Sequence, residues 1–143
     1  MKIRIYKSMR YIHTFKLFES KASSSIDQLV DNYSSLPEEL DKKSEVIGEY
    51  NQIQIRIVNP KILSLYNPEW EKYKGSHHWG KKTSYIPEDE IWIVNGLDPN
   101  SFRKILNHEI IEREMMRALQ EEIGMNTDSS WSQSHHYLKK IGF

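Results

Sequence analysis

The stretch from Pro99 to Ile123 constrains the fold more than any other part of the chain. It has no internal glycine or proline, Asp98 before it suits a helix N-cap, and Gly124 follows it as a helix stop. These signals predict a helix of about seven turns with proline at its first position. The chain has 143 residues, enough for one domain, so the other elements must pack against this helix.

Two short strands are predicted ahead of the long helix. Residues 52–58 alternate polar with apolar, mostly β-branched side chains and stop at Asn59-Pro60, and residues 91–94 form a second apolar run. Between them, residues 66–85 mix aromatic side chains with glycine and proline and show no sustained period. That stretch is expected to be a long loop or a loose hairpin.

Three further helices are predicted, over residues 26–33, 37–47 and 129–141. Residues 37–47 begin with proline and acidic side chains and are followed by Gly48, as at the two ends of a helix. The fold class expected from these elements is α+β. A small sheet should pack against the long helix and a second C-terminal helix.

The domain organisation is expected to be simple. Residues 1–25 are interpreted as a loosely attached N-terminal segment, in which Ile3 and Ile5 suit a short strand. Residues 26–143 are interpreted as a single α+β domain with metal-binding helices over 99–123 and 129–141. Basic residues interrupt the apolar ones near the N-terminus, so neither a signal peptide nor a membrane span is expected. We therefore expect a cytoplasmic protein without a membrane partner.

Charge and cysteine content narrow the classes of partner. Lys plus Arg and Asp plus Glu number 20 each, so the formal net charge is zero and no global field favours nucleic acid. Basic and aromatic residues interleave over residues 4–13, which could contact single-stranded nucleic acid or a partner surface. The chain has no cysteine, so any metal must be held by nitrogen and oxygen ligands.

His108 and Glu112 are the first candidate metal ligands. At helical spacing they complete an apolar stripe on the long helix. The apolar members of that stripe are Ile105, Met115, Leu119 and Ile123. Burying an imidazole and a carboxylate without partners would cost several kcal/mol, and a divalent cation shared by residues four apart would compensate for it. Glu109 follows His108 directly, where a zinc peptidase keeps its general base.

The last helix offers the third ligand. His135 and His136 are adjacent, so only one of them can face the long helix. His135 shares a helix face with Trp131 and Leu138 and is therefore favoured, whereas His136 would face solvent or support a ligand. The predicted site thus has Zn²⁺ held by His108, Glu112 and His135, with Glu109 as the catalytic residue.

A family resemblance supports this site. The segment IWIVNGLDPNSFRKILNHEIIE, residues 91–112, resembles the strand, turn and active-site helix of small zincin-like metallopeptidases, whose helix carries His-Glu-x-x-His. Here Glu112 stands at the second histidine position. The motif is therefore similar to that of a group of small phage and microbial proteins with His-Glu-x-x-Glu, a Gly-Met turn and a later Ala-His pair. Gly124-Met125 and Ser134-His135 match those later elements, so the resemblance covers residues 91–136.

The resemblance implies a zincin-like core in which two histidines and one glutamate hold zinc and Glu109 polarises water. The expected function is a zinc-dependent, peptidase-like hydrolase with a peptide or protein substrate. Residues 10–15, Arg-Tyr-Ile-His-Thr-Phe, also resemble the openings of many small phage-encoded proteins, which indicates a phage origin.

Less specific interpretations remain open beside the hydrolase. Glu109, Glu112 and Glu114 could simply form ion pairs with Arg113 and Arg117 along the helix. A metal could also serve structure alone and tie the last two helices together. In either case the protein would be non-catalytic, for instance a phage virion component or a host-interaction protein.

The aromatic loop contains a second pair of histidines. His77 and His78 could line a substrate cleft, or His77 could donate a hydrogen bond to a reaction intermediate. The alternative is a loop that is simply packed by its aromatic side chains.

Overall fold

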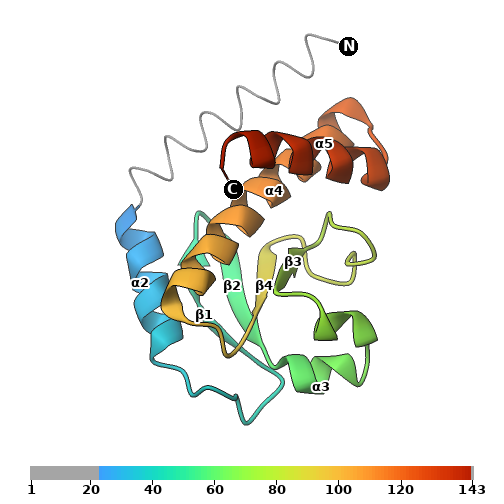
Figure 1. The fold of residues 1–143 in the computed structure, drawn as a ribbon. Coiled ribbons are helices and arrows are strands. Elements are labelled where there is room, and N and C mark those ends of the chain that lie inside the picture. The colour runs from blue at the N-terminus through green and yellow to red at the C-terminus, as the bar shows by residue number, and fades with distance from the viewer. Residues whose placement is uncertain (1–22, 143) are drawn as a thin grey trace.

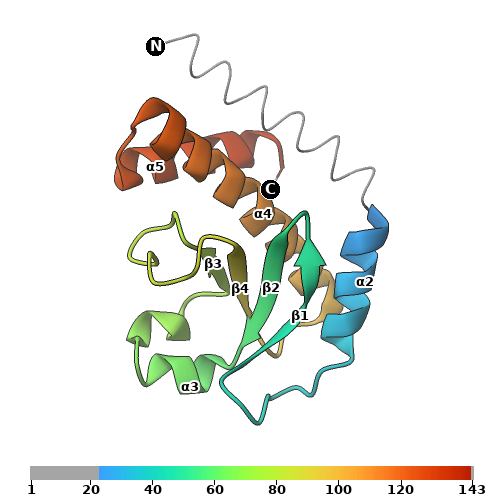
Figure 2. The same ribbon diagram turned by 180° about the vertical axis from the view of Figure 1, so that it is seen from behind.

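The computed structural model describes residues 23–142, and the strand expected at Ile3 and Ile5 lies outside this range. Helices α2 and α4 lie along one face of a small sheet, and α5 packs against α4 (Figures 1 and 2). This arrangement confirms the predicted α+β fold class with two C-terminal helices.

The sheet has four strands within the described residues. They are β1 (Ser44–Tyr50), β2 (Ile53–Val58), β3 (Gly75–His77) and β4 (Glu90–Val94). Their order is β1-β2-β4-β3, in which β2 and β4 are parallel and the other neighbours are antiparallel. Asn51 and Gln52 both have positive φ and form the two-residue loop between β1 and β2, as hairpin turns require.

The helices are α2 (Ser23–Ser34), α3 (Pro60–Ser64), α4 (Pro99–Ile123) and α5 (Thr127–Lys140), with a short 3₁₀ helix η1 (Pro68–Glu71). Helix α4 has the predicted bounds because local signals fix both ends. The Asp98 side chain accepts a hydrogen bond from the Ser101 amide, and Gly124 ends the helix with φ of 74°. None of the helices within residues 23–142 combines the length and apolar character needed to cross a membrane.

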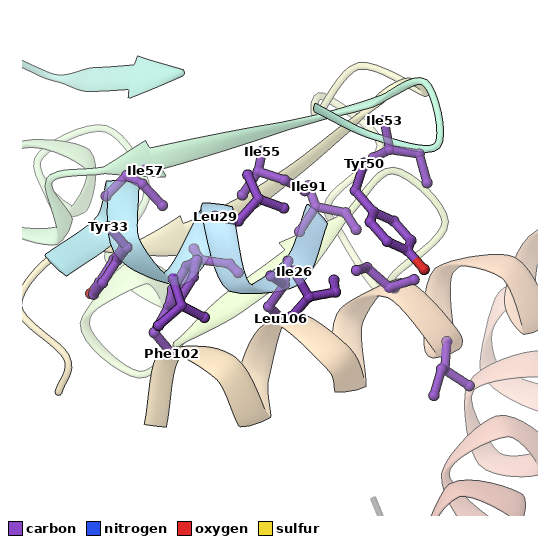
Figure 3. Close-up of a cluster of buried hydrophobic side chains, with 14 of the residues drawn as sticks. Ile26, Leu29, Tyr33, Tyr50, Ile53, Ile55, Ile57, Ile91, Phe102 and Leu106 are labelled. Atoms are coloured by element: carbon purple, nitrogen blue, oxygen red, sulfur yellow. The ribbon is translucent and has the colours of Figure 1, made fainter. Parts of the chain in front are cut away.

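The main core lies between the sheet and the two helices that cover it (Figure 3). Ile26, Leu29 and Tyr33 of α2 face the sheet, while Phe102 and Leu106 approach it from α4. The rings of Tyr33 and Phe102 stack with their centroids 3.9 Å apart. Burying these apolar side chains is the dominant favourable term in folding and fixes α4 against the sheet.

A smaller core holds the long connection between β2 and β4. It contains Val58, Leu63, Trp70, Ile86 and Val94. Trp70 Nε1 also donates a hydrogen bond to the Tyr85 hydroxyl at 2.6 Å. The segment between Trp70 and Ile86 is therefore anchored at both ends, and it includes β3 and both histidines of the aromatic loop.

The predicted helix over residues 37–47 is wrong. Residues 35–43 form turns and bends, and Ser44–Tyr50 is strand β1. Pro37 and Gly48 mimic the ends of a helix, but pairing with β2 overrides that local preference. Gly48 lies at an irregularity in the strand register instead, next to Leu29 of α2.

Replacing Tyr33 with Phe tests how α2 is held to the sheet. The Tyr33 hydroxyl donates to the Val94 carbonyl and accepts from the Leu97 amide, both at 2.8 Å. Removing the hydroxyl leaves two backbone groups without this partner, so Tyr33→Phe should lower the free energy of unfolding by about 1–3 kcal/mol in urea denaturation. Tyr66→Phe, at an exposed tyrosine, is the control and should change it little. Equal effects of the two variants would contradict this role of Tyr33.

Candidate metal centre

Strand β3 brings His77 against helix α4. His77 pairs with Ile91 of β4 and is fully buried, and the Thr83 hydroxyl donates to its carbonyl oxygen at 2.8 Å. The close approach depends on Gly75, because a Cβ there would lie 3.1 Å from Glu109 Cγ and 3.2 Å from the Trp92 carbonyl oxygen. A side chain at this position would push β3 away from α4.

The turn after α4 returns the chain so that α5 lies beside it. Gly124 adopts the left-handed conformation, and the Asn126 side chain caps α5 by accepting from the Ser129 amide. Gln120 of α4 then donates to the Ser130 hydroxyl at 3.0 Å and to the Trp79 carbonyl at 2.9 Å. One side chain thus ties α4 both to α5 and to the aromatic loop.

Glu112 is the centre of the resulting cluster. Its Oε2 lies 2.9 Å from His108 Nε2 and 3.2 Å from His135 Nε2, and its Oε1 lies 3.0 Å from His77 Nε2. Histidines from β3, α4 and α5 therefore surround one carboxylate. Glu109 completes the cluster, with its Oε2 4.0 Å from His77 Nε2.

The pKa values of the two carboxylates in the cluster are shifted in opposite directions. Burial raises the pKa of Glu112, but hydrogen bonds with His108 and His77 and the charges of His77 and His135 outweigh it and hold this pKa well below its usual range. Burial, followed by the charge of Glu112, raises the pKa of Glu109 well above its usual range. Glu112 therefore stays ionised, while Glu109 has a high affinity for a proton.

The ring of His135 lies between two hydrogen-bond acceptors. Its Nδ1 is 3.1 Å from the Trp131 carbonyl oxygen, and its Nε2 is 3.2 Å from Glu112 Oε2. A carbonyl and an ionised carboxylate can only accept, so a neutral ring satisfies just one of them. When Nδ1 donates to the carbonyl, the Nε2 lone pair is directed toward the carboxylate, as in metal-binding histidines.

Within residues 23–142, two groups of side chains could hold a metal ion. The donor atoms of His108, Glu112 and His135 lie within 4.8 Å of one another, and so do those of His77, Glu109 and Glu112. Zinc binds nitrogen and oxygen ligands at roughly 2.0–2.2 Å, which places neighbouring donors about 3.4 Å apart in a tetrahedron. In the first group the contacts of 2.9 and 3.2 Å to Glu112 need only widen slightly to accept an ion.

The first group is also the one that solvent reaches. The side chains of His108 and His135 are 28% and 35% exposed, whereas that of Glu112 is 8% exposed. A pocket of about 270 Å³ adjoins His108 and is lined by Lys104, Ile105, Asn107 and Gly142. An ion held by these three side chains would keep a solvent-facing side, where water or substrate could bind.

The structure brings together all four residues that the sequence pointed to. His108, Glu109 and Glu112 lie on α4, and His135 reaches Glu112 and His108 from α5, while His136 is exposed. His77 was not predicted as a ligand, because nothing in its spacing connects it to residues 31 or more positions later. The only signal was a histidine pair in an aromatic loop, and the pairing of β3 with β4 places it.

Ion pairing along the helix accounts for Glu114 and for the exposed Glu121 of α4. Glu114 pairs with Arg113 and with Arg117, whose guanidinium lies 3.3 Å from Glu114 Oε2. Glu109 and Glu112 face histidines instead. The arginines therefore do not explain why two further carboxylates are buried on this helix.

Comparison with known proteins does not assign the chain to a family. No protein-family model, no curated protein and no solved structure matches the chain. Any assignment of function therefore rests on the geometry of the cluster.

Metal analysis of the purified protein tests the first group of ligands. Protein supplied with zinc should retain one tightly bound equivalent by elemental mass spectrometry, and His108→Ala should retain none because it loses an imidazole ligand. His136→Ala is the matched control and should keep its zinc, since this histidine is exposed. In thermal unfolding, zinc at about 100 times its Kd should stabilise the wild type by about 2.7 kcal/mol. Equal zinc in wild type and His108→Ala would contradict the site.

Proposed function

We propose that this protein is a zinc-dependent hydrolase of the peptidase type. His108, Glu112 and His135 hold the ion, and Glu109 is the general base. When bound, zinc would supply Lewis-acid chemistry that polarises a carbonyl and lowers the pKa of water. The single observation that carries the proposal is the Glu109 carboxylate, which is buried directly after a ligand and has a raised pKa.

The proposed role of Glu109 is to remove a proton from the attacking water. Efficient general bases have a pKa near the working pH, and enzymes raise that of glutamate by burial and by neighbouring negative charge. Both causes act on Glu109. Its Oε2 is buried and has no hydrogen-bond partner within residues 23–142, so it can accept the transferred proton without losing a hydrogen bond to another described residue.

The pocket beside His108 supports a peptide or another amide as the substrate. It combines apolar surface from Ile105 with the side chains of Lys104 and Asn107. The amide side chain of Asn107 can both donate a hydrogen bond to a peptide group and accept one from it.

The competing function is a non-catalytic protein in which the metal fastens α5 to α4. The observation that favours it is the origin of the two imidazoles, since His108 and His135 come from different helices. Such a protein could be a virion component or could bind a host protein. In that case Glu109 would have no role in turnover.

Substitution of Glu109 by Gln separates the two functions. Zinc-loaded wild type should cleave members of a peptide library, and Glu109→Gln should lower the rate by about 10²–10⁴-fold while the tightly bound zinc is unchanged. Glu122→Gln, at an exposed glutamate of the same helix, is the control and should retain activity. Cleavage that survives in Glu109→Gln would show that Glu109 is not the base. Absence of cleavage by the zinc-loaded wild type would favour the structural role.

A further inference from the structure

Glu112 presents its two oxygens to different histidines. Oε2 is shared by His108 and His135, and Oε1 faces His77 on the opposite, fully buried side. A carboxylate that uses both oxygens in this way can bridge two cations, which lie about 3.5–4 Å apart in two-metal sites. The first group of ligands uses only one of these oxygens.

We propose that His77, Glu109 and Glu112 form a second divalent-cation site, which shares the Glu112 carboxylate with the first. The donor atoms of these three side chains lie within 4.8 Å of one another, and all three residues are buried. His77 Nε2 is 3.0 Å from Glu112 Oε1 and 4.0 Å from Glu109 Oε2, so it faces both carboxylates.

An unpartnered carboxylate oxygen supports a cation at this place. Glu109 is 7% exposed, and its Oε2 has no hydrogen-bond partner within residues 23–142 although it lies beside His77. Buried carboxylates are normally compensated by hydrogen bonds, by an opposite charge or by a metal. One cation between His77 and the two carboxylates compensates for both negative charges.

The two sites should differ in affinity. The first has two imidazoles and a solvent-exposed side, and it is expected to take zinc first. The second ion must enter a buried site beside an existing cation and share Glu112 with it, so electrostatic repulsion weakens its binding. The second site should therefore fill only at higher zinc concentrations.

A cation in the second site would also block the proposed role of Glu109. A carboxylate that ligates a metal cannot act as a base, so excess zinc should inhibit the hydrolysis. This consequence rests on the proposed function, whereas the existence of the second site does not.

The test is the zinc stoichiometry of the 143-residue chain. Metal-free protein would be dialysed to equilibrium against increasing concentrations of zinc alone, followed by elemental analysis and by circular dichroism to confirm folding. Wild type should bind one equivalent tightly and a second one more weakly. Two variants should lose only the weaker equivalent. His77→Gln removes the imidazole but keeps a donor for Glu112, and Glu109→Gln removes the carboxylate at constant shape.

His78→Ala is the control, because His78 is the neighbouring histidine of the same loop and lies outside both groups of ligands. It should keep both equivalents. Saturation of wild type at one equivalent, or a second equivalent that persists in folded His77→Gln and Glu109→Gln, would overturn the second site. Neither result bears on cleavage of peptides, so failure of the second site and failure of the proposed hydrolase can be told apart.

Discussion

The buried Glu112 carboxylate is the interaction on which the candidate site depends. An ionised carboxylate removed from water must be compensated, and here the compensating groups come from three separate elements. His108 is supplied by the same helix, His135 by α5 and His77 by β3. The charge therefore couples the C-terminal helix and the edge strand to α4, in addition to the apolar core that holds α4 to the sheet.

The surroundings of the cluster explain how three elements can converge on one side chain. Gly75 allows the backbone of β3 to approach Glu109, and Gln120 hydrogen-bonds both the aromatic loop and α5. On the far side of the sheet, Trp70 anchors the connection that carries β3. The site is thus built on regular elements whose positions are fixed by packing, which favours a defined ligand geometry.

Local signals explain which parts could be predicted from the sequence. Helix α4 has both an N-cap and a glycine stop, so its bounds could be predicted from the sequence. Helical spacing alone also predicts that His108 and Glu112 lie side by side. The place of His77 could not be predicted, since only the pairing of β3 with β4 places it at α4. Strand pairing also explains why residues 37–47 were misleading, because the hairpin that β1 forms with β2 outweighs the helix signals at Pro37 and Gly48.

The cluster has a partly exposed side and a buried side. This asymmetry relates the chemistry of each residue to its burial. The imidazoles of His108 and His135 are partly exposed and a pocket adjoins His108, while Glu109 and His77 lie on the buried side of Glu112. A ligand set used only to fasten two helices would need neither a buried carboxylate without a hydrogen-bond partner nor an accessible face. In the proposed hydrolase, the raised pKa of Glu109 would suit a general base, and the partly exposed imidazoles would suit a metal site that water can reach. The asymmetry across Glu112 therefore supports that proposal over a metal that only fastens the two helices.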